Sequence, residues 1–272
     1  MASSKLAGKS VIVTGGGSGI GLAIVRFFAE QKSVVTIFDI SQENGTSVLA
    51  DLRTEHPQAQ LSFKRCDISD WEAQKKAFDE VYQETGTIDI VIANAGISER
   101  GNFLSRDEGE AQKPTLTTLD VNVSGTLYSI KLGIHYMRKN SASEKGSIIC
   151  TSSNAGIYPF PMAPLYATSK HAVVGAVRSL ARPLALEGIQ INGLAPAVLE
   201  TNIAPDKKLF SAMILTPMSS ITNAVRELVT RPELTGVMAE VHEDKFTFRE
   251  PPAFVDENTG KNIEMFWQLG YA

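Results

Sequence analysis

The chain has 272 residues, of which 43% are hydrophobic and 21% charged, and its formal net charge is −4. That length is sufficient to bury a large core, and the composition is that of an ordinary globular protein. No block rich in lysine or arginine is present, which excludes an electrostatic preference for nucleic acids or anionic membranes. No apolar run approaches about 18 residues, and residues 1–9 lack the apolar region of a secretory signal, so we expect a cytoplasmic protein.

The sequence contains two cysteines, Cys66 and Cys150, and four scattered histidines. These cannot form a disulfide framework, and their spacing matches no zinc motif, so no metal site is predicted. Both cysteines lie in apolar, strand-like surroundings. We therefore expect two reduced thiols in the core.

Along the first two thirds of the chain, short apolar runs alternate with amphipathic stretches. The predicted strands are 10–14, 34–38, 61–66, 88–93, 147–151 and 189–194. The predicted helices lie near 20–31, 42–56, 70–85, 114–139 and 163–187. Nearly unbroken apolarity is typical of parallel strands that are buried on both faces. The alternation therefore predicts the α/β class, with one Rossmann-like, doubly wound parallel sheet and helices on both of its faces.

The pattern weakens after residue 216. We expect a helix near 219–230, a strand near 236–242, and a polar, proline-containing tail over 243–272. Since there is no repeat and no linker, residues 1–272 are predicted to form a single domain, in which 197–232 is a variable substrate loop or lid. Pro183 lies inside one predicted helix and is expected to kink it or end it early.

A glycine-rich turn, Thr14-Gly-Gly-Gly-Ser-Gly-Ile-Gly21, joins the first predicted strand to the first predicted helix. Glycine lets the backbone approach a pyrophosphate, whose charge is then stabilised by the helix N-terminus. The spacing is G-x-x-x-G-x-G rather than the strict G-x-G-x-x-G, and a flexible turn without a ligand is the alternative. The position between strand and helix favours a dinucleotide site with contacts from Gly15, Ser18, Gly19, Ile20 and Gly21.

The second predicted strand runs into Asp39, eighteen residues after Gly21. A carboxylate at this point can accept hydrogen bonds from both ribose hydroxyls of the adenosine half, and it repels a 2′-phosphate. The glycine turn and Ile40, the residue after Asp39, offer no basic side chain for that phosphate. The sequence therefore predicts NAD rather than NADP, with Asp39 and Ile40 in the cofactor site. A surface or helix-capping aspartate is the alternative.

Tyr166 and Lys170 lie four residues apart, and Ser153 precedes the tyrosine by thirteen residues. Residues at i and i+4 of a helix share a face, so an ammonium is expected beside a phenol. A nearby cation favours the phenolate, which lets a group with a pKa of about 10 act as a base nearer neutral pH. Alone, this spacing arises often by chance and usually marks a solvated helix face.

Taken in order, these motifs resemble the short-chain dehydrogenase/reductase family with a Tyr-x-x-x-Lys active site, over about residues 5–201. Four more stretches match that family: Cys66-Asp67-Ile68, Asn94-Ala95-Gly96, Asp120-Val-Asn-Val-Ser-Gly125 and Thr151-Ser-Ser-Asn-Ala-Gly156. The resemblance implies the catalytic residues Asn122, Ser153, Tyr166 and Lys170. It further implies cofactor contacts from Asp67, Ile68, Asn94, Ala95, Gly96, Tyr166, Lys170, Leu199 and Thr201.

The resemblance also implies how these residues act. Tyr166 takes the alcohol proton, while Ser153 hydrogen-bonds the substrate oxygen. Lys170, helped by the positive oxidised nicotinamide, is expected to lower the pKa of the phenol from about 10 to about 7, and it also holds the nicotinamide ribose. Asn122 is expected to anchor a water that relays protons.

Four other polar residues near these motifs are not expected to act in the site. His171, next to Lys170, faces another side of the predicted helix, and His135 lies in the middle of a helix. Glu99 and Arg100 follow the Asn-Ala-Gly stretch, where contact with substrate is conceivable, but exposed loop residues are the expectation.

The sequence departs from the family pattern near its end. Pro196-Ala197 replaces the usual Pro-Gly, and an Asp-Gly-Gly that often closes the last strand is missing. The stretch Gly236-Val-Met-Ala-Glu-Val-His242 is more similar to the hydroxyprostaglandin-dehydrogenase-like branch. We expect a homodimer or homotetramer, and a dimer through the helices that carry Asn122 and Tyr166 is favoured.

The predicted function is NAD-dependent oxidation of a lipophilic secondary alcohol. Bulky apolar residues occupy the expected substrate loops, namely Ile97, Tyr158, Phe160, Met162, Leu199, Phe210, Met213, Ile214 and Leu215. They fit a steroid-, prostaglandin-, terpenoid- or polyketide-like substrate better than a sugar, although loop residues of this kind also pack on a core. The alternatives are a ketone reductase, an isomerase acting on a natural-product scaffold, and a non-catalytic NAD-binding regulator.

Overall fold

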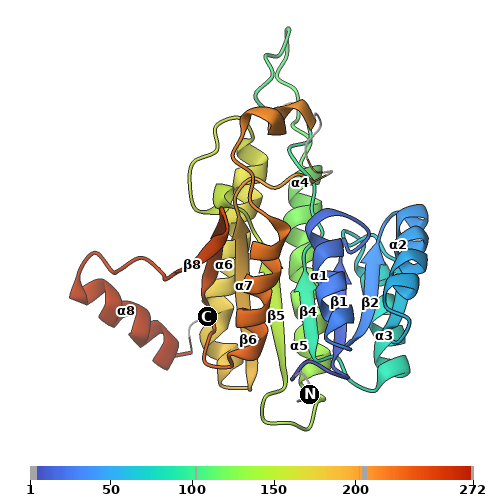
Figure 1. Ribbon diagram of the computed structural model, residues 1–272. Coiled ribbons are helices and arrows are strands. Elements are labelled where there is room, and N and C mark those ends of the chain that lie inside the picture. Colours follow the sequence, from blue (N-terminus) through green and yellow to red (C-terminus); the bar gives the residue numbers. More distant parts are fainter. Residues whose placement is uncertain (1–4, 102, 202, 204–206, 271–272) are drawn as a thin grey trace.

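The computed structural model describes residues 5–101, 103–201, 203 and 207–270. Within them, eight strands form one sheet in the order β3-β2-β1-β4-β5-β6-β7-β8 (Figure 1). The strands are β1 (Ser10–Thr14), β2 (Val34–Asp39), β3 (Gln60–Arg65), β4 (Ile90–Ala93), β5 (Gly146–Thr151), β6 (Ile189–Pro196), β7 (Met238–His242) and β8 (Lys245–Arg249). All neighbouring strands are parallel except β7 and β8, which are antiparallel. The predicted α/β class and doubly wound sheet are confirmed.

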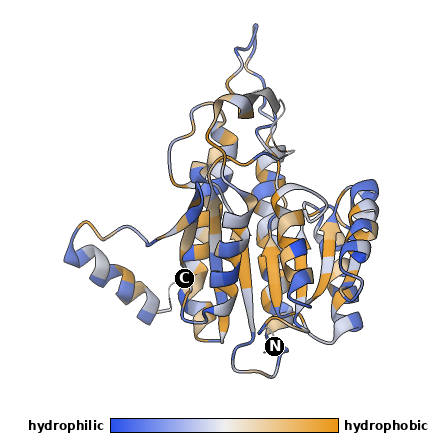
Figure 2. Ribbon diagram, viewed as in Figure 1, coloured by the Kyte–Doolittle hydropathy of each residue, from blue (hydrophilic) through white to orange (hydrophobic). Residues whose placement is uncertain are grey.

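Helices cover both faces of the sheet (Figure 1). They are α1 (Gly19–Glu30), α2 (Gln42–Glu55), α3 (Trp71–Thr85), α4 (Thr117–Leu119), α5 (Thr126–Met137), α6 (Pro164–Ala185), α7 (Met218–Thr230) and α8 (Glu257–Gln268). One apolar core cluster joins the sheet to α1, α2 and α7, and includes Phe28. The second joins it to α3, α5 and α6, and includes Phe78. The strands are accordingly the most uniformly apolar part of the chain (Figure 2).

Helix α3 illustrates how local sequence sets these elements. Asp70 begins it, because its carboxylate accepts hydrogen bonds from the backbone N–H groups of Glu72 (2.9 Å) and Ala73 (3.1 Å). Gly86 ends it in the left-handed conformation, with φ of 74°. Between these ends, Phe78 turns inward and meets the ring of Phe38 on β2 edge to face at 5.5 Å.

Two predicted elements differ from the structure in detail. The single helix expected over 114–139 is divided into α4, a π-helical turn (Asp120–Gly125) and α5. Gly125 permits this turn to approach the segment between β3 and α3 closely, because a Cβ there would lie 2.8 Å from the Ile68 side chain. Pro183 does not stop α6 at its own position: the helix continues to Ala185, two residues short of the predicted end.

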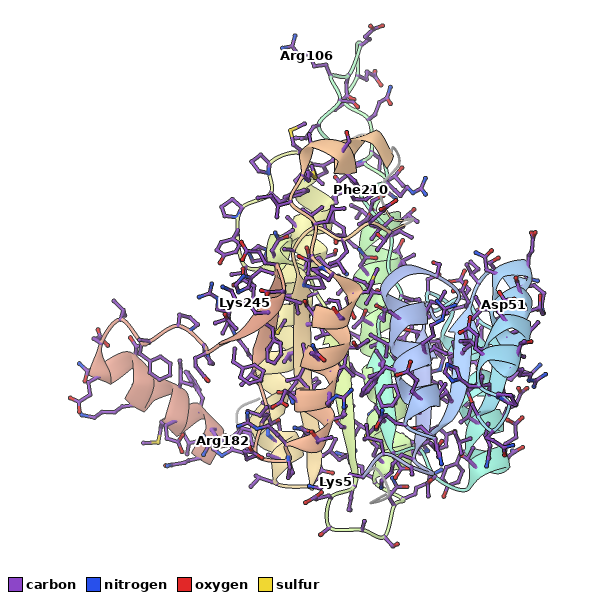
Figure 3. All side chains as sticks on the ribbon, in the orientation of Figure 1. Lys5, Asp51, Arg106, Arg182, Phe210 and Lys245 are labelled. Carbon is purple, nitrogen blue, oxygen red and sulfur yellow. The ribbon has the colours of Figure 1, made fainter. Side chains whose placement is uncertain are left out.

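The C-terminal region contains more structure than the sequence indicates. The expected polar tail over 243–272 includes β8 and α8, neither of which was predicted. Helix α8 has no buried residue and projects from the body beside α6 (Figure 1). It is attached through Arg182 on α6, which pairs with Glu264 at 2.5 Å and lies 4.5 Å from the Trp267 ring (Figure 3).

Cys66 and Cys150 are buried and unpaired, as predicted. Burial raises the pKa of each thiol to about 12, so both stay protonated. In the described part of the chain, no helix is long and apolar enough to cross a membrane, and no cluster of side chains could hold a metal ion. The cytoplasmic location remains a prediction.

The packing of Gly45 in α2 generates a test of the fold. Replacing a helical glycine with alanine usually stabilises a protein by about 0.5–1 kcal/mol. At Gly45 a Cβ would lie 2.0 Å from the Phe63 ring, so we expect Gly45→Ala to destabilise the fold by about 1–3 kcal/mol in urea denaturation. Gly175 in α6 has open space at this point, and Gly175→Ala should give the usual gain. Equal effects of the two substitutions would contradict the described packing of α2 on β3.

Candidate active site

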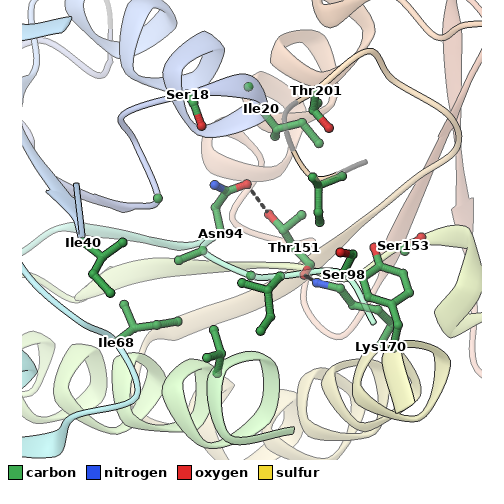
Figure 4. A pocket seen from close by; sticks show the side chains of 18 of the residues that line it. Ser18, Ile20, Ile40, Ile68, Asn94, Ser98, Thr151, Ser153, Lys170 and Thr201 are labelled. Carbon is green, nitrogen blue, oxygen red and sulfur yellow. Dashed lines mark hydrogen bonds between the residues drawn. The ribbon is translucent and has the colours of Figure 1, made fainter. Parts of the chain in front are cut away.

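A cavity of about 560 Å³ lies at the carboxyl ends of the parallel strands. Its position spans the point where the sheet order reverses between β1 and β4. In Figure 4, Ile40 and Ile68 lie at one end, and Ser98, Ser153 and Lys170 lie at the other. The predicted residues that line it are Gly15, Ser18, Gly19, Ile20, Asp39, Ile40, Asp67, Ile68, Asn94, Ala95, Gly96, Ser153, Tyr166, Lys170, Leu199 and Thr201. Two predicted residues, Gly21 and Asn122, do not line it.

The glycine turn brings the backbone close to its neighbours on three sides. Gly15 has φ of 65°, and a Cβ there would lie 2.9 Å from Ala95. Gly19 has φ of 52°, and a Cβ there would lie 3.3 Å from the Thr201 side chain. At Gly21 a Cβ would lie 2.1 Å from the Gly15 carbonyl oxygen, so this glycine serves close packing rather than ligand contact. The turn leads into α1. The Ser18 side chain does not cap this helix, so the N-terminus of α1 suits an anion.

Asp39 holds the glycine turn against the end of β2. Its carboxylate accepts a hydrogen bond from the Gly17 N–H at 2.9 Å and another from the Ser41 N–H at 3.0 Å. A carboxylate has about four acceptor sites, so two remain for the hydroxyls of a ligand. Asp39 therefore combines a structural bond with the geometry expected of a ribose acceptor.

Asn94 ties three strands together beneath the cavity. Its Nδ2 donates to the Thr14 carbonyl at 3.0 Å, and its Oδ1 accepts from the Thr151 hydroxyl at 3.2 Å (Figure 4). The Thr14 hydroxyl in turn accepts from the N–H groups of Asn94 (2.9 Å) and Ala95 (3.0 Å). These bonds fix the floor of the cavity at the ends of β1, β4 and β5.

Lys170 is buried with an exposed fraction of 3%, and its ammonium donates to the Thr151 carbonyl at 3.0 Å. Its Nζ lies 5.5 Å from the centre of the Tyr166 ring, which confirms that the two side chains share one helix face. Burial disfavours the ammonium and lowers the pKa of Lys170 to about 8. The cation is therefore poised to lose its proton only slightly above neutral pH.

The phenol of Tyr166 differs from the expectation. Burial raises its pKa above the ordinary value, and the hydrogen bond from Ser153 acts in the opposite direction without reversing the shift. Lys170 alone therefore does not make Tyr166 a base near pH 7. The expected decrease to about 7 depends on the further positive charge that the oxidised nicotinamide would bring.

Asn122 is buried in the π-helical turn and serves the loop that follows β4. Its Oδ1 accepts from the Ile97 N–H at 2.8 Å, and its Nδ2 donates to the Ile97 carbonyl at 2.9 Å. The same Nδ2 donates to the Ser169 hydroxyl of α6 at 3.0 Å. Asn122 therefore links the loop to the tyrosine helix, and its role with a relay water remains a prediction.

Glu99 is the residue whose contacts the sequence did not indicate. It is half-buried, and its carboxylate accepts hydrogen bonds from the N–H groups of Leu165 (3.2 Å) and Tyr166 (2.7 Å). Because its partners lie 66 and 67 residues away, no local pattern could reveal them. His171 and His135 are exposed and do not line the cavity.

The substrate end of the cavity is lined by few of the residues predicted for it. Of the expected apolar residues, Ile97 and Leu199 line it, and they are joined by Ser98, Arg100, Thr117, Val121 and Ile203. The exposed residues Tyr158, Phe160, Met162, Met213, Ile214 and Leu215 do not line it, nor does the buried Phe210. No sequence spacing indicated Thr117 and Val121, because Asn122 beside them does not line the cavity and the turn at Val121 is π-helical. Residues 202 and 204–206 of the expected lid segment lie outside the described residues.

Known proteins show the same sequence pattern. The sequence model of the family described as short chain dehydrogenase matches residues 9–211. A short-chain dehydrogenase/reductase of Stachybotrys chlorohalonatus is 34% identical over 210 residues, which are 74% of this chain and 60% of that protein. A 3α-hydroxysteroid dehydrogenase of Mediterraneibacter gnavus is 33% identical over 198 residues, which are 73% of this chain and 76% of that protein. The chain thus spans less than two thirds of the Stachybotrys protein.

A solved structure agrees with this similarity at the level of the fold. The crystal structure of levodione reductase superposes with a TM-score of 0.76 at 23% sequence identity, over 86% of this chain and 96% of that chain. The hydroxyprostaglandin-dehydrogenase-like branch remains a prediction. On the family match over residues 9–211, the chain belongs to the short-chain dehydrogenase/reductase family.

Proposed function

We propose that the protein is an NAD-dependent oxidoreductase that oxidises a lipophilic secondary alcohol to a ketone. The observation that carries this proposal is that Ser153, Tyr166 and Lys170 line the same cavity as Asp39. One cavity therefore holds a phenol that can accept a proton, a hydroxyl that can donate a hydrogen bond and a buried ammonium. The glycine turn and Asp39, which suit a dinucleotide, line the same cavity. Family membership supports the reaction class, because short-chain dehydrogenases and reductases act on CH–OH groups.

The residues of the cavity fit a bound dinucleotide. Gly15 and Gly19 line the cavity with left-handed backbone conformations, with φ of 65° and 52°, so the bare backbone of the turn would face a pyrophosphate. Asp39 would accept the adenosine ribose hydroxyls, and Asp67 and Ile68 would border the adenine. At the other end, Lys170 and Thr201 would hold the nicotinamide half.

NAD is favoured over NADP by the charge at the adenosine end. Asp39 repels a 2′-phosphate, and among the described side chains the cations that line the cavity, Arg100 and Lys170, lie with the substrate-end and catalytic residues. One basic side chain does lie near Asp39: Arg65, at the end of β3, donates its Nε to the Ile40 carbonyl at 3.3 Å. It does not line the cavity.

The proposed reaction divides the work among few groups. Bound NAD supplies an acceptor for the hydride that leaves the carbinol carbon. The phenolate oxygen of Tyr166 takes the hydroxyl proton, while the Ser153 hydroxyl donates a hydrogen bond to the substrate oxygen. Lys170 stabilises the phenolate electrostatically, in a buried setting where a charge acts strongly. Oxidation is the proposed direction because the charge at Asp39 favours NAD.

The substrate class follows from the lining of the other end. Ile97, Val121, Leu199 and Ile203 offer apolar surface, while Ser98 and Arg100 add polar groups. A bulky apolar alcohol fits this composition better than a sugar. The hydroxysteroid dehydrogenase among the relatives supports the same class.

We propose a homodimer as the assembly, through the helices of Asn122 and Tyr166.

The first prediction concerns the proton acceptor. Tyr166→Phe removes the only atom that would take the proton and leaves the dinucleotide cradle unchanged. We expect turnover of a panel of secondary alcohols (cyclohexanol, 1-phenylethanol and a 3α-hydroxysteroid) with NAD to fall by at least about 10³-fold. The NAD dissociation constant should change by less than about 3-fold. Activity retained in the variant would exclude Tyr166 as the base.

The second prediction concerns the choice of cofactor. Asp39→Ala removes the repulsion of a 2′-phosphate and leaves Arg65 beside the site, so affinity for NADP should rise while affinity for NAD falls. We expect the NAD-over-NADP preference to decrease by at least about 100-fold in dissociation constants. Adding Arg65→Ala should reverse the gain in NADP affinity. An unchanged preference in Asp39→Ala would remove Asp39 from its proposed role.

The third prediction follows from the lowered pKa of Lys170. Its pKa is about 8 in the folded chain against an ordinary 10.5, so between these values the unfolded chain binds a proton that the folded chain has lost. The contribution of Lys170 to the free energy of unfolding therefore rises with pH between about 8 and 10.5, by about 3 kcal/mol at most. Lys170→Met should be inactive and more stable than the unmodified protein at pH 7. Its free energy of unfolding, measured by urea denaturation, should not show this rise with pH. Exposed Lys131→Met serves as the control, and an identical pH dependence in Lys170→Met would contradict the prediction.

A further inference from the structure

The N-terminus of α6 has an unusual way of satisfying its backbone. Ala163 precedes the helix and has no side-chain acceptor, and Pro164 has no N–H group. The first intrahelical bond runs from the Ala167 N–H to the Ala163 carbonyl at 2.9 Å. Only two donors of the first turn remain, those of Leu165 and Tyr166, and Glu99 accepts from both.

Glu99 reaches this helix from a loop that is itself fixed at two points. Asn122 binds both backbone groups of Ile97, on one side of Glu99. On the other side, the buried Thr118 hydroxyl accepts from the Arg100 N–H at 2.9 Å and donates to the Ser98 carbonyl at 3.2 Å. The carboxylate therefore extends from a rigid support.

The backbone of Tyr166 is held at both of its polar groups. Its N–H donates to Glu99 at 2.7 Å, the shorter of the two bonds. Its carbonyl accepts from the Ser169 hydroxyl at 2.6 Å, and that hydroxyl accepts from Asn122 at 3.0 Å. The first restraint comes from Glu99 in the loop after β4, and the second comes from Asn122 through Ser169. The backbone of Tyr166 is therefore fixed relative to these two segments and not only within its own helix.

We propose that Glu99 is a positioning residue for Tyr166. Its carboxylate takes the place of the missing N-cap and sets where the phenol lies relative to Ser153 and to the proposed substrate end of the cavity. This inference rests on the proposed function, in which Tyr166 is the proton acceptor. A displacement of about 1 Å in such a group can cost about 100-fold in rate.

The inference is tested with Glu99→Ala, Glu99→Gln and a matched control. In Glu99→Ala we expect kcat with NAD and the best alcohol of the panel above to fall about 10- to 100-fold, while the NAD dissociation constant changes less than 2-fold. Glu99→Gln keeps one oxygen acceptor and should remain within about 3-fold of the unmodified protein. Unchanged kcat in Glu99→Ala, or a loss in Glu99→Gln as large as in Glu99→Ala, would overturn the proposal.

Asp70→Ala is the matched control, because Asp70 also caps a helix through two N–H groups but lies at α3. We expect it to lower the melting temperature and to leave kcat within 2-fold. If Asp70→Ala reduces kcat as strongly as Glu99→Ala, general destabilisation explains both, and the proposal fails.

A measurement without substrate accompanies the kinetics. Amide hydrogen exchange at residues 165–167 should accelerate at least 10-fold in Glu99→Ala and stay unchanged in Asp70→Ala. Unchanged exchange in Glu99→Ala would overturn the proposal on its own. The Tyr166→Phe result keeps the two ideas distinguishable: an active Tyr166→Phe contradicts the proposed function, whereas an inactive Tyr166→Phe beside a fully active Glu99→Ala contradicts only the role of Glu99.

Discussion

Lys170 carries an ammonium group into a part of the protein from which water is almost excluded. A buried cation is costly unless it is hydrogen-bonded, and the Thr151 carbonyl is the bonded acceptor that the structure provides. That carbonyl ends β5, whose Thr151 side chain also binds Asn94 at the end of β4. The position of the cation therefore depends on the sheet edge, and the cation lies 5.5 Å from the centre of the Tyr166 ring. The lowered pKa of Lys170 indicates that stability is given up to keep this group buried.

The rest of the site is arranged around this edge. The parallel strands end together, so the glycine turn after β1, Asp39 after β2 and Ser153 after β5 face one cavity although they lie far apart in the sequence. Helix α6 approaches from the second face of the sheet with Tyr166 near its start. Asn122 and Glu99 connect that start to the loop after β4. A network of backbone-directed hydrogen bonds, rather than apolar packing alone, thus fixes the tyrosine.

The extent to which sequence predicts this protein varies with the range of the interactions. Uniform apolarity predicted six of the seven parallel strands, and a weaker pattern near 236–242 predicted the seventh. The motifs and the family resemblance together indicated sixteen residues that line the cavity. Gly21 and Asn122 were also singled out, but they act by packing and by hydrogen bonds behind the cavity wall. Glu99 lies in a loop as expected, but it is half-buried rather than exposed, and its contacts could not be predicted because its partners lie on another element. Helix α8 was not predicted because it buries nothing. The raised pKa of Tyr166 could not be predicted either, since it follows from burial in the folded chain.

The central claim is that this cavity transfers a hydride from a carbinol carbon to NAD. It is tested most directly by incubating the protein with NAD and secondary alcohols that carry deuterium on that carbon, followed by mass spectrometry of the recovered NADH. The account predicts NADH heavier by one mass unit, and unlabelled NADH from the unlabelled alcohols. Recovery of NAD unchanged with every alcohol, or formation of NADH without deuterium, would contradict it.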